Sequence, residues 1–120
     1  MVNQVNLGAK IVSDISLRNT TKKGVPVADF RVLHKNRKLT NPLFIDVEVW
    51  GDEAMRVYEN VKRGDTVVLV GELRRDVWSA KESGEARSKI KITASRVVVT
   101  DEFRVKPVEV TKVTSTENSV

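Results

Sequence analysis

The segment Leu43–Trp50 alternates strictly between two kinds of side chain, and this pattern constrains the fold more than any other. One set is aliphatic (Leu43, Ile45, Val47 and Val49), and the other combines two aromatics with two acids (Phe44, Asp46, Glu48 and Trp50). Successive side chains of a β-strand point to opposite faces. The segment is therefore predicted as a strand with an aliphatic face toward the core and an aromatic, acidic face outward.

Most of the remaining chain is also predicted as strand. Apolar and β-branched residues favour strands over residues 25–33, 66–73 and 88–100, and residues 2–17 form either one long strand or two short ones. Residues 74–87 are typical of a β-hairpin whose polar tip lies near Glu82-Ser83-Gly84. Phe30 falls on the core face of its strand.

Residues 51–63 are predicted as the helix of the chain, with Asp52 as N-cap and Gly64 just after its end. An apolar stripe indicates which side chains face the core (Ala54, Met55, Val57, Tyr58 and Val61). Five strands with one helix between the third and fourth are typical of the OB-fold, a small Greek-key barrel of the all-β class. The lack of strand–helix alternation argues against a parallel sheet.

The composition excludes several classes of function. A chain of 120 residues suits one domain, and the absence of cysteine excludes disulfides and thiolate metal sites. Its six glycines form no phosphate loop, and we expect neither a catalytic site, a metal nor a cofactor. The acid pairs Asp46/Glu48 and Asp52/Glu53 are expected to be ordinary solvated residues. No apolar run spans a membrane and no signal peptide is evident, so a cytoplasmic, nucleoid-associated location is expected.

Aromatic and basic side chains are predicted to share the outer face of the sheet. Basic residues number 21 against 16 acidic ones, and the aromatic candidates are Phe44, Trp50 and Trp78. The candidate cations are Arg31, Lys35, Arg37, Lys38, Arg74, Arg75, Lys89 and Lys91. Rings stack on unpaired bases and cations attract phosphates, so this combination favours single-stranded nucleic acid. The outer face of the helix carries both acidic and basic residues, so it is poorly suited to bind in a groove of double-stranded DNA.

Each of these assignments has a structural alternative. Trp50 ends its strand beside Gly51 and could pack beneath the helix. Phe44 could be covered by the loop of residues 35–42 or by a partner chain. The acids Asp46 and Glu48 should repel phosphate and lower affinity, unless they pair with Arg31, Lys89 or Lys91.

Over residues 2–99 the chain resembles the bacterial-type single-stranded-DNA-binding proteins. The motifs that carry the resemblance are Val2-Asn3-Gln4-Val5, Val27-Ala28-Asp29-Phe30, the strand from Phe44 to Trp50-Gly51, Lys62-Arg63-Gly64-Asp65, Val70-Gly71-Glu72-Leu73-Arg74 and Trp78. Each of these motifs is common by itself, but their combination in this order and spacing is not. By this likeness Phe44, Trp50 and Trp78 occupy the stacking positions of the family, and Lys38 stands near another aromatic position.

The resemblance also implies an assembly. It predicts a homotetramer built partly through the first strands, residues 2–7, with DNA wrapped around it. The family usually ends in a flexible linker and an acidic tip that recruits replication and repair enzymes, whereas residues 114–120 carry no such tip. Recruitment by that route is therefore in doubt, which would fit a phage or mobile-element relative, an organelle-type member or a shortened form.

The sequence as a whole predicts a DNA-binding OB domain over residues 1–103 and a flexible C-terminal extension over residues 104–120. The predicted function is sequence-nonspecific binding and protection of single-stranded DNA in replication, recombination and repair. Two alternatives remain open. One is an OB module that binds RNA, and the other is a primosome-type OB adaptor whose outward aromatics bury against protein.

Overall fold

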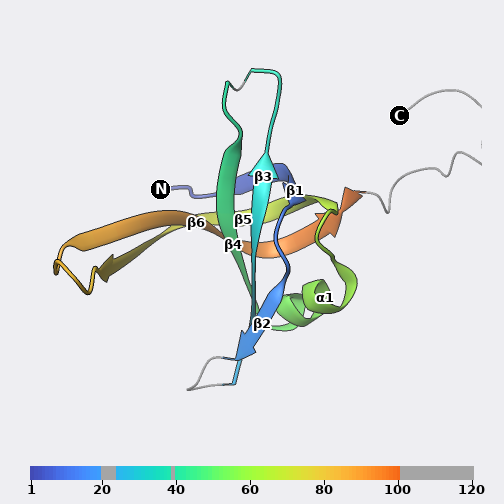
Figure 1. The fold of residues 1–120 in the computed structure, drawn as a ribbon. Coiled ribbons are helices and arrows are strands. Elements are labelled where there is room, and N and C mark those ends of the chain that lie inside the picture. Colours follow the sequence, from blue (N-terminus) through green and yellow to red (C-terminus); the bar gives the residue numbers. More distant parts are fainter. Residues whose placement is uncertain (20–23, 39, 101–120) are drawn as a thin grey trace, which may run out of the picture.

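The computed structural model describes residues 1–19, 24–38 and 40–100, and these form six strands and one helix (Figure 1). The elements in chain order are β1 (Val5–Ile11), β2 (Ser16–Asn19), β3 (Pro26–His34), β4 (Leu43–Trp50), α1 (Asp52–Asn60), β5 (Thr66–Ser79) and β6 (Ala86–Val99). The predicted C-terminal extension, residues 104–120, lies outside the described residues. No helix in the described part is long and apolar enough to cross a membrane.

The strands form a ring that is nearly a closed barrel. The sheet order is β1-β5-β6-β4-β3-β2, and β1 also pairs with β3 through Lys10 and Ile11. Both β1 and β2 pair with β3, so the predicted first strand is interrupted at residues 12–15 and counts as two. With these two counted as one, the helix lies between the third and fourth strands. The all-β OB-fold prediction is confirmed.

The interior of the ring is filled by aliphatic side chains from every wall. Ile11, Val32, Val49, Leu69 and Val97 are fully or almost fully buried and belong to one cluster. On β4 the inner face is buried at Val47 and Val49, whereas Leu43 is exposed where the strand leaves the barrel. Phe30 is buried as predicted.

The helix is shorter than predicted and begins differently. Gly51, at a φ of 73°, precedes its first turn, and no side chain caps that turn, so the prediction of Asp52 as N-cap is wrong. The chain is already extended at Val61, and Gly64 has a φ of 97° in a tight turn closed by the N–H of Asp65 on the carbonyl of Lys62. Glycine adopts this left-handed conformation at little cost.

Two predicted core residues of the helix are wrong. Met55 is 36% exposed. Tyr58 is 49% exposed, because α1 buries only Ala54 and Val57 toward the barrel, followed by Val61 after its end. Successive residues lie about 100° apart around a helix axis, so Met55 and Tyr58 each lie about 100° beyond the buried residue that precedes them, Ala54 and Val57. The sequence stripe was thus wider than the face that the barrel contacts.

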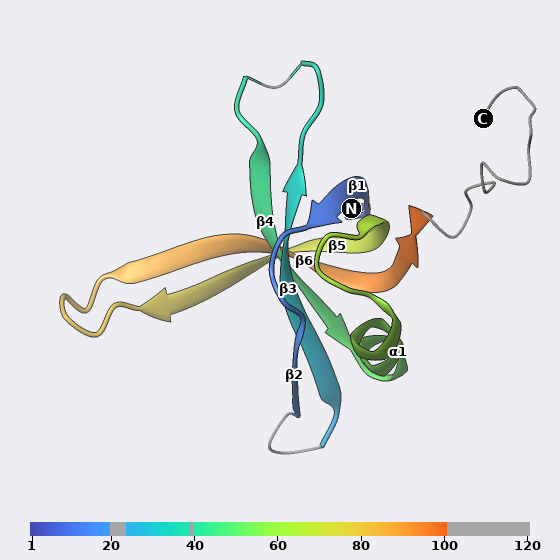
Figure 2. The ribbon, with the colours of Figure 1, turned by 45° about the vertical axis from the view of Figure 1, so that its right-hand side comes forward.

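The ends of β5 and β6 leave the barrel together as a long two-stranded arm, which Figure 2 shows clearly. They remain paired from Val67 with Val99 to Ser79 with Ala86, and the register shifts once, at Val70/Gly71. The turn at the tip includes Gly84, so the predicted hairpin tip is confirmed.

Candidate nucleic-acid interface

The outer face of β4 lies in the middle of a three-stranded surface. Asp46 is in register with Arg31 of β3 on one side and with Lys91 of β6 on the other. Directly opposed residues point to the same side of a sheet. The outer side chains of β4 therefore share their surface with the basic side chains predicted on β3 and β6.

All three predicted stacking aromatics are exposed. Phe44 is 55% exposed, Trp50 43% and Trp78 48%. At these exposures Trp50 is not buried beneath α1, and the described residues of the loop 35–42 leave Phe44 open. Period two along β4 places Phe44 and Trp50 on the same outer face.

The arm presents Trp78 on this same side. Trp78 opposes Arg87, and four residues away along each strand Arg74 opposes Lys91. Alternation therefore places Trp78, Arg74 and Lys91 on one face of the arm. Arg75 opposes Ile90, so its side chain projects from the reverse face of the arm.

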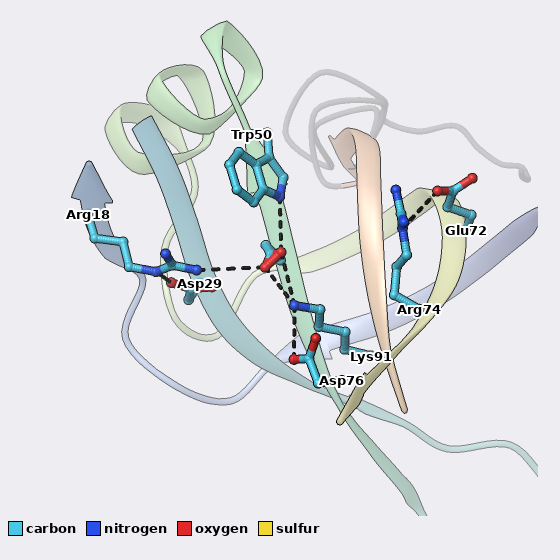
Figure 3. A network of polar contacts seen from close by, with 8 residues as sticks. Arg18, Asp29, Trp50, Glu72, Arg74, Asp76 and Lys91 are labelled. Carbon is cyan, nitrogen blue, oxygen red and sulfur yellow. Dashed lines mark hydrogen bonds and ion pairs between the residues drawn. The ribbon is translucent and has the colours of Figure 1, made fainter. Parts of the chain in front are cut away.

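Glu48 lies at the centre of a network of polar contacts around this surface. Figure 3 labels its partners Arg18, Trp50 and Lys91. Its side chain is only 8% exposed. The ammonium group of Lys91 contacts its two carboxylate oxygens at 2.8 and 3.0 Å, and the indole N–H of Trp50 donates to Oε2 at 3.0 Å. The guanidinium of Arg18 completes the set at 3.7 Å.

The outer residues of this network extend it to two more acids. Lys91 also pairs with Asp76 at 3.0 Å, and Arg18 pairs with Asp29 at 2.7 Å. Burial alone would lower the pKa of Lys91, but hydrogen bonds to Glu48 and Asp76 raise it above its ordinary value. The sequence prediction did not include Arg18, Asp29 or Asp76. Asp29 lies two residues before Arg31, and this spacing was the signal that could have placed it on this face.

Asp46 forms a second cluster beside the first. Its carboxylate oxygens accept from the guanidinium of Arg31, at 2.9 Å, and from the ammonium group of Lys89. Burial raises the pKa of Asp46, but the hydrogen bonds from Lys89 and Arg31 outweigh it and the pKa is lowered. The sequence alternative in which Asp46 and Glu48 pair with Arg31, Lys89 and Lys91 is the one observed.

The other predicted cations are less engaged. Lys35, Arg37 and Lys38 lie exposed in the loop that joins β3 to β4 and have no ion pair within the described residues. His34 anchors the start of that loop, with Nδ1 2.6 Å from the carbonyl oxygen of Gly8. Arg74 pairs with the exposed Glu72 at 2.9 Å. In the same described part of the chain, Arg75 forms no ion pair.

Two grooves follow the network across the surface. The larger has a volume of about 890 Å³ and is lined by Trp50, Gly71, Arg74 and Lys91 among others. The smaller, about 440 Å³, lies over β2, β3 and β4, and Glu48, Asp76 and Lys91 line both. Among the residues described, no group of three His, Cys, Asp or Glu side chains could hold a metal ion. The surface thus offers grooves beside exposed rings and charged side chains, which suits a flexible, base-bearing polyanion.

Comparison with known proteins identifies similar chains. The sequence model described as the single-strand binding protein family matches residues 2–100. The "Single-stranded DNA-binding protein" of Treponema pallidum is 28% identical over 80% of this chain and 56% of its own length. The protein of that name from Corynebacterium glutamicum is 32% identical over 78% of this chain and 44% of its own length. The matches thus span about half the length of these curated relatives.

A solved structure shares the fold. The crystal structure of the SSB domain of a Synechococcus protein superposes with a TM-score of 0.65 at 26% sequence identity. The match covers 82% of this chain and 96% of that one. The barrel described above is therefore the fold of that domain.

Proposed function

Because the chain belongs to the single-strand binding protein family, we propose that it binds single-stranded DNA with little sequence preference and protects it during replication, recombination and repair. Members of this family are DNA-binding proteins without enzymatic activity, and the prediction that the chain is not an enzyme is confirmed at the level of the family. Such a role places the protein with the DNA inside the cell.

The observation that carries the proposal is the exposure of three aromatic rings on one continuous face. Phe44 and Trp50 come from β4, and Trp78 comes from the arm of β5 and β6. Every base has a π-face, so stacking contributes roughly 1–3 kcal/mol per base without reading base identity. The grooves between these strands give the sugar–phosphate backbone a path beside the rings.

Cations around the rings would supply the phosphate contacts. Lys35, Arg37 and Lys38 are free to do so in the β3–β4 loop, and Arg74 and Arg75 stand on the arm. Arg31, Lys89 and Lys91 are on the proposed surface as well, each with a carboxylate partner. Phosphate contacts release counterions, so affinity should fall as salt concentration rises.

The proposal includes assembly into a homotetramer. Along β1, residues Val5–Lys10 pair with β5, whereas β3 pairs only with Lys10 and Ile11. The other edge of β1 is thus largely unpaired among the described residues, and an unpaired edge is a template for a second strand. Pairing of β1 between copies would cover it.

A binding titration with matched variants tests the proposal. Trp78→Ala should weaken binding of labelled oligo-dT by about 1–3 kcal/mol, because one stacking platform is lost. Tyr58→Ala is the control, since Tyr58 has nearly the same exposure but lies on α1. Equal affinities of wild type, Trp78→Ala and Tyr58→Ala would remove Trp78 from the site.

Two further measurements separate the alternatives. Tighter binding of oligo-U than of matched oligo-dT would favour the RNA-binding module. Light scattering after size exclusion, with and without oligo-dT of about 35 to 70 nucleotides, reports subunit number and binding together. A defined oligomer that binds neither nucleic acid would favour the protein adaptor and refute the proposed function.

A further inference from the structure

The charges at the centre of the proposed DNA-binding face cancel. Six ion pairs join four basic side chains to four carboxylates there, and the members are Arg18, Arg31, Lys89 and Lys91 with Asp29, Asp46, Glu48 and Asp76. A chain with a net charge of +5 thus presents a neutral patch where it is expected to meet a polyanion.

The geometry of this patch differs from that of ordinary surface ion pairs. Exposed pairs contribute little because long side chains are costly to hold and water screens them. Here Glu48 is almost fully covered, and both of its carboxylate oxygens contact Lys91. In Asp46 one carboxylate oxygen pairs with Arg31 and the other with Lys89. These partners are held in place before any DNA arrives.

We propose that Asp46 and Glu48 act as internal competitors of phosphate, holding Arg31, Lys89 and Lys91 so that the centre of the face binds DNA mainly by stacking. This inference rests on the proposed function. The phosphates of the bound strand are then contacted mainly at the periphery, where Lys35, Arg37 and Lys38 have no carboxylate partner within the described residues. The two acids are thus positioning residues that set affinity and its dependence on salt.

Most substitutions in a binding surface weaken binding, but neutralising these acids should strengthen it. Removing the charge of Asp46 releases Arg31 and Lys89 onto the path of the strand. Removing the charge of Glu48 leaves Lys91 and Arg18 with one carboxylate each, so affinity should increase rather than fall in both variants. Each cation that gains a phosphate adds about 0.7 to the magnitude of the salt slope for a single strand. For one such cation, and with equal affinities at about 1 M salt, that slope corresponds to a gain of roughly threefold at 0.2 M salt and roughly eightfold at 0.05 M.

The experiment compares Asp46→Asn and Glu48→Gln with wild type in titrations of labelled oligo-dT from 0.05 to 0.3 M salt. Both replacements keep the shape of the side chain and remove one negative charge. Glu59→Gln is the control, because it changes net charge equally on the exposed face of α1. We expect both face variants to bind more tightly with a steeper salt slope, and the control to match wild type.

Each result decides the inference. Folded Asp46→Asn protein that binds no more tightly than wild type, with an unchanged slope, overturns it. Asp46 is less buried than Glu48, so this variant still tests the inference if Glu48→Gln fails to fold. An increase equal to that of Glu59→Gln also overturns it, since net charge alone would then explain the gain. If wild type itself does not bind oligo-dT, the proposed function fails instead.

Discussion

The indole N–H of Trp50 donates a hydrogen bond of 3.0 Å to Oε2 of Glu48, two residues earlier on the same face of β4. The exposed ring is therefore tied at its edge to a carboxylate that is itself held by Lys91. Holding the ring in advance reduces the entropy that stacking would otherwise cost. An exposed aromatic and a covered acid thus form one unit of the proposed binding surface.

Trp50→Phe should reduce stability, because it removes this hydrogen bond while keeping an aromatic ring. A hydrogen bond to a charged group contributes about 1.5–3 kcal/mol, and the partial exposure of Trp50 places the expected loss near the lower end. Urea unfolding measures the change. Trp78→Phe is the matched control, since the indole N–H of Trp78 has no partner within the described residues, and an equal loss in both variants would contradict the prediction.

Lys38→Ala should weaken binding of oligo-dT through the phosphate term alone. Lys38 is exposed in the β3–β4 loop and has no ion pair among the residues described, so its ammonium group is free to contact a phosphate. We expect the magnitude of the salt slope to fall by about 0.7. Lys62→Ala removes the same charge from the turn after α1 and should leave the salt slope as in wild type. A salt slope that stays the same in Lys38→Ala would contradict the prediction.

Acid should destabilise the fold partly through Glu53, which ties α1 to β6. Its carboxylate accepts from Arg56 at 2.6 and 2.8 Å and from the backbone N–H of Val97 at 3.0 Å. The hydrogen bond from Arg56 is the main cause of its lowered pKa; burial opposes this shift, and the N–H of Val97 adds to it. Because the pKa is lower in the folded state, this contribution is complete above about pH 4.3 and is lost as the pH falls further.

The prediction for Glu53→Gln is a lower stability at neutral pH and a shallower decline below about pH 4. Urea unfolding from pH 7 to pH 3 measures both. Glu59→Gln on the same helix is the control, because Glu59 has no ion pair within the described residues and this variant should retain the wild-type profile. A variant whose stability falls with acid as steeply as that of wild type would show that Glu53 is not the group responsible.

Gly71→Ala should destabilise the protein at the point where the arm leaves the barrel. An added Cβ would lie 2.2 Å from the carbonyl oxygen of Thr93 and 2.7 Å from the Cα of Ala94, and backbone atoms yield little. We expect a loss of about 1–3 kcal/mol in unfolding experiments, as for other overpacked sites. Gly8→Ala is the control, because open space surrounds Gly8 on β1. Equal stabilities of the two variants would count against the close approach.

Much of the fold was predictable because it depends on local periodicity. The alternation over Leu43–Trp50 predicted that strand with its observed bounds, and it placed Phe44 and Trp50 on the outer face. Alternation along β3 likewise predicted that Phe30 is buried. Turn residues predicted the tip of the arm near Gly84. The predicted ends of α1 were wrong, because the ends of a helix depend on how the flanking backbone turns. The exposure of Tyr58 depends on how wide a contact the barrel offers.

The sequence by itself thus determined the order of strands and helix and the faces on which rings and charges lie, since both follow from spacing along the chain. Only the tertiary structure decided which charges meet. Glu48 of β4 finds Arg18 of β2 and Lys91 of β6 because the strands close into a ring, and Asp76 joins them from the arm. Coulomb attraction acts through space, and the chain brings residues 18, 48, 76 and 91 together only when it is folded.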